Sequence, residues 1–378
     1  MEFLENFKPE LIVESPGRIN LIGEHTDYNM GYVLPTAIGK KIVFKLQRNN
    51  SDTLCNVYTL GYEEGFQVNL NQLSKSDIEW RNYVLGVLNE ISKRTDKLGG
   101  FDCTIESNLP TGSGLSSSAA LECGLAFGLN ELFDIGLSKL EMVKLCQIAE
   151  HTFAGTLCGI MDQYASVMSE AGKVILLDCR SLEQKMIPID LHPYKIILLN
   201  TKVSHSLATS EYNVRKAECE EGISILQKKY PIIKSLRDVN KEMLTEFKTE
   251  MSALVFKRCA FILHENERVL QMTKALQTNN LDEVGTILYE AHEGISNEYE
   301  VSCKESDFLV DFSKTNDSVL GARQTGGGFG GCTLNIVHEE AVAEFVKSSA
   351  TAYKKAFDID LEWFEVTPSE GTRAKWVR

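Results

Sequence analysis

The sequence predicts an α+β protein made of two lobes, and two observations support this. Strand-like and helix-like segments alternate along the whole chain, with no internal repeat and no low-complexity linker. Near residues 180–190 the pattern changes, and long helical segments dominate beyond it. The 378 residues are 43 % hydrophobic, which is enough for a sizeable core. We therefore expect lobes at 1–183 and 184–378, with a ligand cleft between them.

The first lobe is predicted to begin with strands and to continue with helices. Strand character runs through 11–23, stops at the polar stretch EHTDYNMG (24–31), and resumes through 32–47. Further strands are expected at 54–60, 66–70, 101–107 and 173–179. Helices are expected at 80–94, 116–133 and 138–153, followed by a partly apolar segment at 159–168. Ser138 and Glu141 form a capping-box pattern at the start of the third helix.

The second lobe is predicted to be richer in helix. It opens with a strand at 195–201. Long helices are expected at 208–229, 253–278 and 281–300. A strand, a glycine loop and a second strand follow within 318–337, and the last elements are a helix at 339–356 and a strand at 361–368.

Composition excludes several classes of protein. The net charge of −14 argues against a general nucleic-acid binder, because such binding depends on lysine and arginine. The ten cysteines include no CxxC pair and lie mostly in apolar runs, as expected of buried thiols in a reducing compartment. No signal-peptide pattern and no apolar run near ~20 residues is present, so we expect a cytoplasmic protein that does not engage a membrane. The acidic composition favours a monomer.

A loop rich in glycine and serine, PTGSGLSSSAA (110–120), joins a predicted strand to a predicted helix. Its glycines allow close backbone approach to a ligand, and the free N–H groups of the following helix point back at the loop, as in phosphate sites. The lysine of a P-loop is missing, and Ser117 stands where a Rossmann motif has its third glycine. From these residues alone, a phosphate site and an ordinary helix start capped by serine remain equally open.

Charged side chains gather in PGRINLIGEHTDYNMGYVLP (16–35). Arg18, Glu24, His25 and Asp27 lie in a segment otherwise apolar enough for a core, and charged residues are rarely buried unless paired. One interpretation is a surface loop with an internal ion pair. The other is a polar pocket whose carboxylates and imidazole bind the hydroxyls of a sugar, while the arginine faces a phosphoryl group.

Two other stretches are candidate sites. In GTLCGIMDQYAS (155–166), which follows Glu150, Asp162 lies among glycines and beside Gln163, so it is either a helix cap or part of a site. In GARQTGGGFGGC (321–332), five glycines occupy six positions at 326–331, at a cost in backbone entropy. That cost is understandable if the loop packs closely against a ligand or another loop; a flexible surface hairpin is the alternative.

Together these four stretches resemble the galactokinase family of the GHMP small-molecule kinases. The match to 16–35 is long and specific, whereas PTGSGLSSSAALE and GARQTGGGFGGCTLNIV alone resemble only the superfamily. The resemblance implies an N-terminal lobe like ribosomal protein S5 domain 2, a C-terminal lobe with a ferredoxin-like sheet, and an active site in the cleft between them. It also implies ATP-dependent phosphorylation of D-galactose at its C1 hydroxyl, the first committed step of the Leloir pathway.

The resemblance also assigns roles to individual residues. Asp162 matches the catalytic base and Arg18 the arginine beside it, which would favour the ionised carboxylate. Ser118 and Glu150 match the ligands of Mg²⁺, a cation that prefers oxygen donors. The remaining matches are ATP contacts at Gly112, Ser113, Gly114, Leu115, Ser116, Ser117 and Ser118, and galactose contacts at Glu24, His25, Thr26, Asp27 and Tyr212. Whether Asp162 removes the proton or mainly orients the hydroxyl is open.

Three other functions remain to be weighed. A kinase for N-acetylgalactosamine or arabinose would share the same motifs, although CGIMDQ (158–163) is more like galactokinases. A galactose-sensing regulator would bind the substrates without turnover, but the serine-rich loop that such proteins lose is intact here. A mevalonate or homoserine kinase is disfavoured, because the carboxylates of EHTDYN would repel an anionic substrate.

Overall fold

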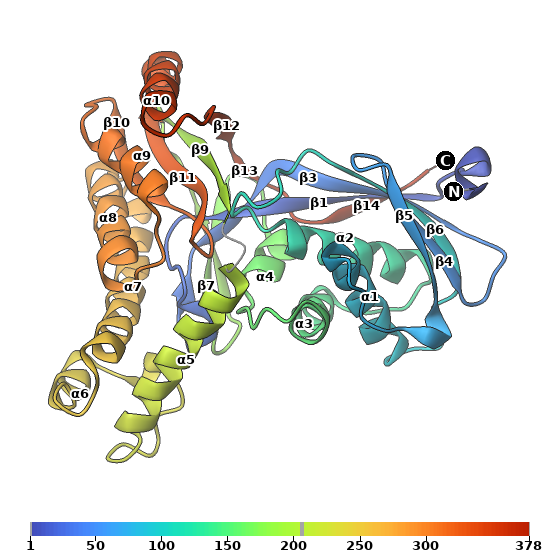
Figure 1. Cartoon of the computed structure of the whole chain (residues 1–378), viewed down its shortest axis with the longest axis horizontal. Coiled ribbons are helices and arrows are strands. Elements are labelled where there is room, and N and C mark those ends of the chain that lie inside the picture. The colour runs from blue at the N-terminus through green and yellow to red at the C-terminus, as the bar shows by residue number, and fades with distance from the viewer. Residues whose placement is uncertain (1, 205–207, 378) are drawn as a thin grey trace.

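The computed structural model describes residues 2–204 and 208–377, and it confirms a two-lobed α+β protein. In Figure 1 the N-terminal lobe lies at the right, with a large sheet above a layer of helices. The C-terminal lobe stands at the left, where long helices run beside a smaller sheet. No helix in these two described ranges is long and apolar enough to cross a membrane.

A seven-stranded sheet forms the first layer of the N-terminal lobe, in the order β14-β1-β3-β6-β4-β5, with β13 also paired to β3. All its pairs are antiparallel except β4 with β6. The inner face carries the apolar side chains of alternate residues, such as Val13, Phe44 and Leu46. The strands are β1 (Leu11–Asn20), β3 (Pro35–Arg48), β4 (Leu54–Thr59), β5 (Glu64–Asn69), β6 (Phe101–Ser107), β13 (Pro368–Ser369) and β14 (Arg373–Trp376).

Four helices lie below this sheet in Figure 1: α1 (Glu79–Ser92), α2 (Ser117–Leu132), α3 (Lys139–Ala149) and α4 (Met161–Met168). Helices α2 and α4 pack against β1 and β3, and α1 and α3 pack on these helices. The capping box of Ser138 and Glu141 at the start of α3 is confirmed. Gly124 lets α2 pack closely on the sheet, because a Cβ there would lie 2.1 Å from a ring carbon of Phe44. A π-helical turn, Glu150–Ala154, continues α3 and leads towards the cleft.

The C-terminal lobe contains a four-stranded antiparallel sheet in the order β10-β11-β9-β12. Its strands are β9 (Tyr194–Ser204), β10 (Val319–Gln324), β11 (Gly330–His338) and β12 (Glu362–Val366). In chain order they alternate with helices as strand, helices, strand, strand, helix, strand, which is the predicted ferredoxin-like pattern. A smaller sheet is formed by β2 (Tyr32–Val33), β7 (Lys173–Asp178) and β8 (Gln184–Pro188).

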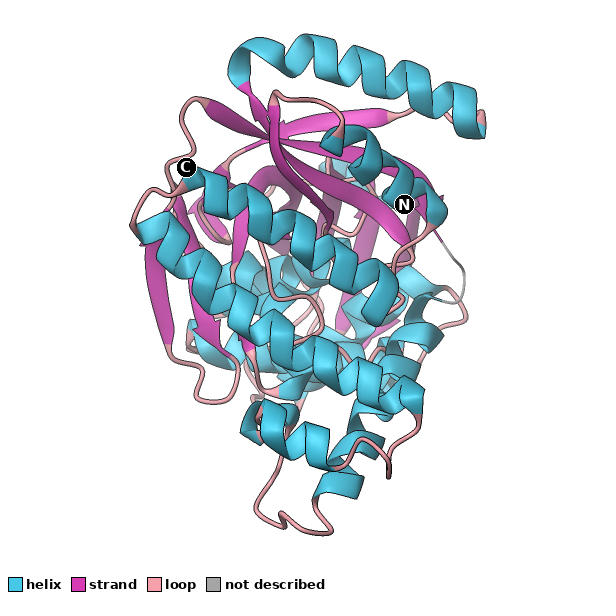
Figure 2. Cartoon of the chain, turned by 90° about the vertical axis from the view of Figure 1, so that its left-hand side faces the viewer, coloured by secondary structure: helices cyan, strands magenta, loops and turns pink. Residues whose placement is uncertain are grey.

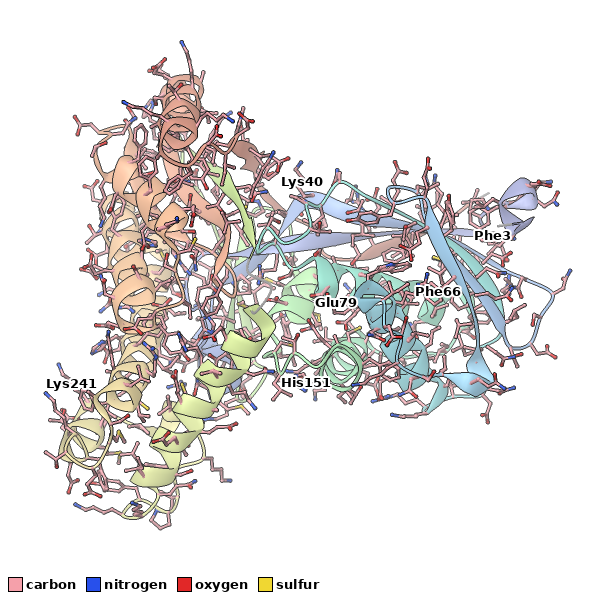
Figure 3. All side chains as sticks on the ribbon, in the orientation of Figure 1. Phe3, Lys40, Phe66, Glu79, His151 and Lys241 are labelled. Carbon is pink, nitrogen blue, oxygen red and sulfur yellow. The ribbon has the colours of Figure 1, made fainter. Side chains whose placement is uncertain are left out.

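Helices cover one side of this lobe, as Figure 2 shows in a view from the left of Figure 1. They are α5 (Ala208–Leu226), α6 (Lys241–Glu246), α7 (Ala253–Gln277), α8 (Leu281–Glu293), α9 (Lys304–Lys314) and α10 (Val342–Phe357). Figure 3 adds the side chains in the orientation of Figure 1, with Phe3 and Lys40 labelled in the first lobe and Lys241 in the second. One large hydrophobic cluster contains residues of both lobes, including Leu11, Val269 and Leu334.

Several short elements were not predicted from the sequence. They include the helices α4, α6 and α9, and the strands β8, β13 and β14. The sequence RAKW of β14 alternates polar and apolar residues over only four positions, which is too short a run to predict a strand, and its pairing with β1 makes it one. The division into 1–183 and 184–378 stays a prediction, and three strand pairs cross it: β8 with β7, β13 with β3 and β14 with β1.

Candidate active site

A cavity of about 190 Å³ opens where the two lobes meet. Seven of the predicted site residues line it: Arg18, Glu24, His25, Asp27, Glu150, Asp162 and Tyr212. They come from the end of β1, the loop after it, the turn after α3, the start of α4 and the start of α5. Segments separated by almost two hundred positions therefore meet in one wall, as the sequence interpretation required.

Arg18 and Asp162 form a two-point hydrogen-bonded ion pair. Arg18 Nε and Nη2 donate to the two carboxylate oxygens of Asp162, at 2.8 and 2.9 Å. The third nitrogen, Nη1, donates to the carbonyl of Gly114 at 2.5 Å. The hydroxyl of Ser116 also donates to Asp162 Oδ2, at 2.5 Å. One arginine thus joins the acid at the start of α4 to the loop before α2.

The glycine–serine loop (residues 110–120) ends at the N-terminus of α2. Ser116 is the N-cap residue and adopts a left-handed conformation, with φ +57°. Ser117 and Ser118 begin the helix, so their N–H groups lie in the first turn, where no intrahelical acceptor exists. Ser113 and Leu115 are buried, the former donating to the carbonyl of Pro110 at 2.7 Å.

The glycine loop (residues 326–331) packs against the glycine–serine loop from the other lobe. A Cβ on Gly114 would lie 2.9 Å from the carbonyl of Thr325, and one on Gly326 would lie 2.6 Å from the carbonyl of Gly114. A Cβ on Gly331 would lie 2.8 Å from the carbonyl of Ser113. Of the two interpretations from sequence, the tightly packed loop is therefore right, and its glycines let two backbones touch.

Glu150 occupies the first position of the π-helical turn after α3, a type of turn often found at functional sites. Its carboxylate accepts hydrogen bonds from Gln163 Nε2 at 2.6 Å and from the thiol of Cys158 at 3.4 Å. Burial, and then the charge of Asp162, raise the pKa of Glu150 to about 7, against hydrogen bonds that include one from Ser118. A buried carboxylate beside a serine hydroxyl is a donor set suited to a hard cation.

A cation here would need ligands from outside the protein. Among the described residues, no group of three or more histidine, cysteine, aspartate or glutamate side chains could hold a metal ion. Mg²⁺ usually keeps several waters and takes oxygens from substrate phosphates. Ser118 and Glu150 therefore fit a magnesium nucleotide better than a resident metal ion.

Asp27 also lines the cavity, and its carboxylate lies in a confined place. A Cβ on Gly159 would lie 1.9 Å from Asp27 Oδ2, so only glycine fits beside this carboxylate. The N–H of Tyr28 donates to Asp27 Oδ1 at 2.9 Å. Burial, followed by the charge of Asp162, raises the pKa of Asp27 from 3.8 to about 7. A ligand that donates hydrogen bonds would relieve this unfavourable burial.

Glu24 is tied to the second lobe. Its Oε1 pairs with Arg323 Nη2 at 2.8 Å and accepts from the N–H of Gly326 at 2.8 Å. Arg323 is fully buried, and Glu24 is 2 % exposed. Burial raises the pKa of Glu24, and the charge of Arg323 opposes the shift. Glu24 therefore lines the cavity and also anchors the glycine loop.

The structure places the other predicted sugar contacts, Tyr212, His25 and Thr26, in different surroundings. Tyr212 lines the cavity, and its ring lies 5.1 Å from that of His25. His25 also lines the cavity, but Nε2 lies 3.1 Å from the carbonyl of Gly327. Thr26 is fully buried and is not in the cavity wall. Its hydroxyl faces the carbonyls of Gly23 and Tyr32, so the structure gives it a role in the turn.

Some residues of the site were missed from sequence. Six further residues line the cavity: Thr156, Cys158, Gly159, Met161, Gly327 and Gly328. Their segments were singled out, but nothing in them showed which side chains face inwards. His151, labelled in Figure 3, ties this wall together, because its Nε2 lies 2.7 Å from the carbonyl of Cys158. Arg323 lies in the third motif, yet only the structure pairs it with Glu24.

Three family models match the chain. The model described as galactokinase galactose-binding signature matches residues 1–48. The GHMP kinases N terminal domain matches 82–170, and the GHMP kinases C terminal model matches 272–356. These matches cover the loop after β1, the glycine–serine loop and the glycine loop.

Three relatives of similar length are named galactokinase. Galactokinase of Thermosipho africanus is 41 % identical over 359 residues, which cover 95 % of this chain and 98 % of that protein. Galactokinase of Thermotoga petrophila is 39 % identical over 96 % of this chain and 99 % of that protein. Galactokinase of Clostridium perfringens is 38 % identical over 98 % of this chain and 97 % of that protein.

Solved structures agree with these relatives. Lactococcus lactis galactokinase complexed with galactose matches with a TM-score of 0.93 and 34 % identity, over 98 % of this chain and 97 % of that one. Mevalonate kinase of Methanococcus jannaschii matches with a TM-score of 0.63 and 18 % identity, over 95 % of this chain and 98 % of that one. The second match shows only that the fold is shared.

Proposed function

The chain belongs to the galactokinase family of the GHMP kinases and phosphorylates D-galactose with ATP, and we propose which of its residues carry out the transfer. The products are ADP and α-D-galactose 1-phosphate. The relatives named above support this substrate, and none of them supports the alternatives of another sugar or a non-catalytic sensor.

One observation carries the assignment of the site: Arg18 contacts both the acid in the proposed sugar site and the loop proposed to bind the phosphates of ATP. Two of its nitrogens hold Asp162 in the sugar cavity, and the third holds Gly114 in the glycine–serine loop. Phosphoryl transfer depends mainly on positioning the acceptor against the phosphate and on stabilising charge. An arginine that fixes the acceptor acid and the phosphate loop relative to each other meets both needs.

Asp162 is proposed to bind the C1 hydroxyl of galactose. A carboxylate offers about four acceptor positions, and Arg18 and Ser116 fill three of them. One position on Oδ1 is left for the hydroxyl. Held there, the hydroxyl donates its hydrogen to Asp162 and keeps its oxygen lone pairs free for the γ-phosphate. Asp162 is therefore proposed to orient the hydroxyl and to accept its proton during the transfer.

The glycine–serine loop is proposed to hold the phosphates of ATP through backbone N–H groups at the start of α2. Such a helix start favours anions without a lysine. Ser118 and Glu150 would hold Mg²⁺, which supplies charge neutralisation of the β- and γ-phosphates when bound. Glu24, Asp27 and Tyr212 are proposed to bind the other sugar hydroxyls, since all three line the cavity.

We also propose a cytoplasmic monomer. All ten cysteines are free, which suits a reducing compartment. Charged pairs such as Arg373 with Glu14 lie on the exposed edge of the seven-stranded sheet and disfavour strand-to-strand association there. Sedimentation of the purified protein would test the monomer, and a stable dimer would contradict it.

Initial rates with several sugars at saturating MgATP test the proposed site. Galactose, talose, 2-deoxygalactose, glucose and N-acetylgalactosamine are compared by ADP release. We expect galactose to give the highest kcat/KM. Equal rates with glucose and galactose would show that the sugar contacts are wrongly assigned. Galactose binding without ADP release would favour a sensor instead.

A further inference from the structure

We propose that His25 is a positioning residue, which holds the glycine loop over the sugar cavity through a one-directional chain of hydrogen bonds that begins at Cys219. This deepens the proposed function and rests on it. The glycine loop supplies Gly327 and Gly328 to the cavity wall, so its position determines the shape of the sugar site. On this proposal His25 acts through Gly327, whereas the neighbouring acids contact the sugar directly.

The direction of the chain follows from its last link. His25 Nε2 lies 3.1 Å from the carbonyl of Gly327, and a carbonyl can only accept. The proton of His25 must therefore be on Nε2. In a neutral imidazole the other nitrogen, Nδ1, is then an acceptor. His25 is buried, and burial lowers its pKa to about 3, so the neutral ring is the form to consider.

The donor and the acceptor of each earlier hydrogen bond in the chain now follow in turn. Nδ1 accepts, so the hydroxyl of Tyr28, 2.8 Å away, donates its single hydrogen to His25. The oxygen of Tyr28 is then the acceptor for the hydroxyl of Tyr299, also at 2.8 Å. The hydroxyl of Tyr299 has donated its only hydrogen, so the thiol of Cys219 donates to the oxygen of Tyr299 across 3.3 Å. Asn29 Nδ2 lies 3.8 Å from Cys219 Sγ, a long contact to sulfur.

The hydrogen-bond chain begins and ends beside the loop after β1, because Asn29 also donates to the carbonyl of His25 at 3.0 Å. Aromatic rings enclose it: the ring of Tyr299 lies 4.9 Å from that of His25, and Tyr28 and Tyr212 are 5.1 Å apart. Tyr299 is fully buried. Dry surroundings strengthen such hydrogen bonds and make an unpaired member costly.

Two hydrogen bonds from neighbouring residues hold the glycine loop. Glu24 accepts from the N–H of Gly326, and His25 donates to the carbonyl of Gly327. Two consecutive residues of one loop therefore hold two consecutive residues of the other. Gly328 has φ +96°, and a Cβ there would lie 2.4 Å from the carbonyl of Val301, so the loop has little freedom to settle elsewhere.

The substitutions His25→Gln and His25→Asn separate positioning from sugar binding. The glutamine amide nitrogen reaches about as far as Nε2 and can donate to Gly327, whereas that of asparagine reaches only as far as Nδ1. We expect His25→Gln to keep KM for galactose within about threefold of the parent, and His25→Asn to raise it about tenfold, as one lost hydrogen bond would. The kcat should change little in either. Equal losses in both variants would overturn the proposal.

Nitrogen NMR of ¹⁵N-histidine-labelled protein tests the chain without relying on activity. The His25 resonance, assigned by its loss in His25→Gln, should show the Nε2–H tautomer in the parent protein. Tyr28→Phe should shift the tautomer balance and raise KM for galactose. Tyr353→Phe is the matched control, because its buried hydroxyl bonds to the carbonyl of Thr201, outside the site.

The outcomes distinguish this proposal from the proposed function. An Nδ1–H tautomer in the parent protein would overturn the chain, even if galactose is phosphorylated normally. The same result follows if Tyr28→Phe and Tyr353→Phe behave alike in both KM and tautomer. An Nε2–H tautomer in a protein that does not phosphorylate galactose would instead contradict the function while leaving the chain in place.

Discussion

Arg18 binds both oxygens of Asp162, at 2.8 and 2.9 Å, and this pair decides how the acid can act. The side chain of Arg18 is only 4 % exposed, whereas that of Asp162 is 26 % exposed and open to the cavity. The arginine is thus fixed by the protein, and the acid presents its remaining acceptor position to a ligand. Charge and orientation are set before the sugar arrives.

Asp162→Asn should lower kcat by about 10²–10⁴-fold, the range typical of a positioned acid–base group. The amide keeps the shape of the side chain but loses the charge that Arg18 balances. Turnover with galactose and MgATP measures the effect, and thermal unfolding shows whether the fold is kept. Asp52→Asn, at an exposed turn, is the control. A variant at position 162 with near-parent kcat would refute the assignment.

Ser118→Ala should raise the Mg²⁺ concentration required for turnover, with little change in galactose binding. The hydroxyl of Ser118 lowers the pKa of Glu150, against the effect of burial, and both residues belong to the proposed cation site. A Mg²⁺ titration of the rate and calorimetry of galactose binding without nucleotide measure the two effects. Ser348→Ala, an exposed helical serine that bonds to the carbonyl of Glu344, is the matched control. Weakened sugar binding with an unchanged Mg²⁺ requirement would contradict the role.

Asp27→Asn should stabilise the sugar-free protein, and by more at pH 8 than at pH 5. Burial first, and the charge of Asp162 second, raise the pKa of Asp27 from 3.8 to about 7. Between these values the folded chain keeps a proton that the unfolded chain releases. Stability therefore falls as pH rises through this window, and the loss is complete above the folded pKa.

An uncharged asparagine avoids that loss, which is at most about 4 kcal/mol for such a shift. Urea unfolding of both proteins at pH 5 and pH 8 gives the comparison. The parent protein should lose more stability than the variant between the two pH values. Parallel pH dependence in the two proteins would show that Asp27 ionises normally in the folded state.

Arg323→Leu should destabilise the protein by about 3–5 kcal/mol, because it leaves the buried carboxylate of Glu24 without its partner. Adding Glu24→Gln removes that charge and should recover about half of the loss. Urea unfolding of the single and double variants measures this coupling. If the two substitutions destabilise additively, the ion pair does not link the lobes energetically.

Gly326→Ala should strongly reduce activity. Its φ is +89°, and its Cβ would lie 2.6 Å from the carbonyl of Gly114, so the two loops must separate. Gly39→Ala is a matched control, since no atom lies within 4 Å of a Cβ there. The kcat/KM for both substrates should fall in the first variant and stay near the parent value in the second. Two equally active variants would show that the contact between the loops is dispensable.

The long elements and the motifs could be predicted from the sequence because their signals are local. The capping box at Ser138 is a pattern of neighbours, and it is present in the structure as expected. Strand β14 is only four residues long, too short for a local signal, and its partner β1 lies at the other end of the chain. Tertiary pairing decides elements of that kind.

The same distinction holds within the site. Motif positions identified Arg18 and Asp162, and the structure brings them into contact. The sequence could not show that the hydroxyl of Thr26 is used within its own turn, or that His25 faces a carbonyl of the other lobe. Such roles depend on where a side chain points after distant segments have met.

The return of β13 and β14 to the first sheet means that the chain crosses between the lobes twice, between β8 and β9 and again between β12 and β13. The C-terminal end of the chain therefore completes the first lobe, and no cut at a single position divides the sequence into the two lobes. Removal of the residues after β12 would leave β1 as an unpaired edge of the seven-stranded sheet, so both ends of the sequence are needed to complete that side of the first lobe.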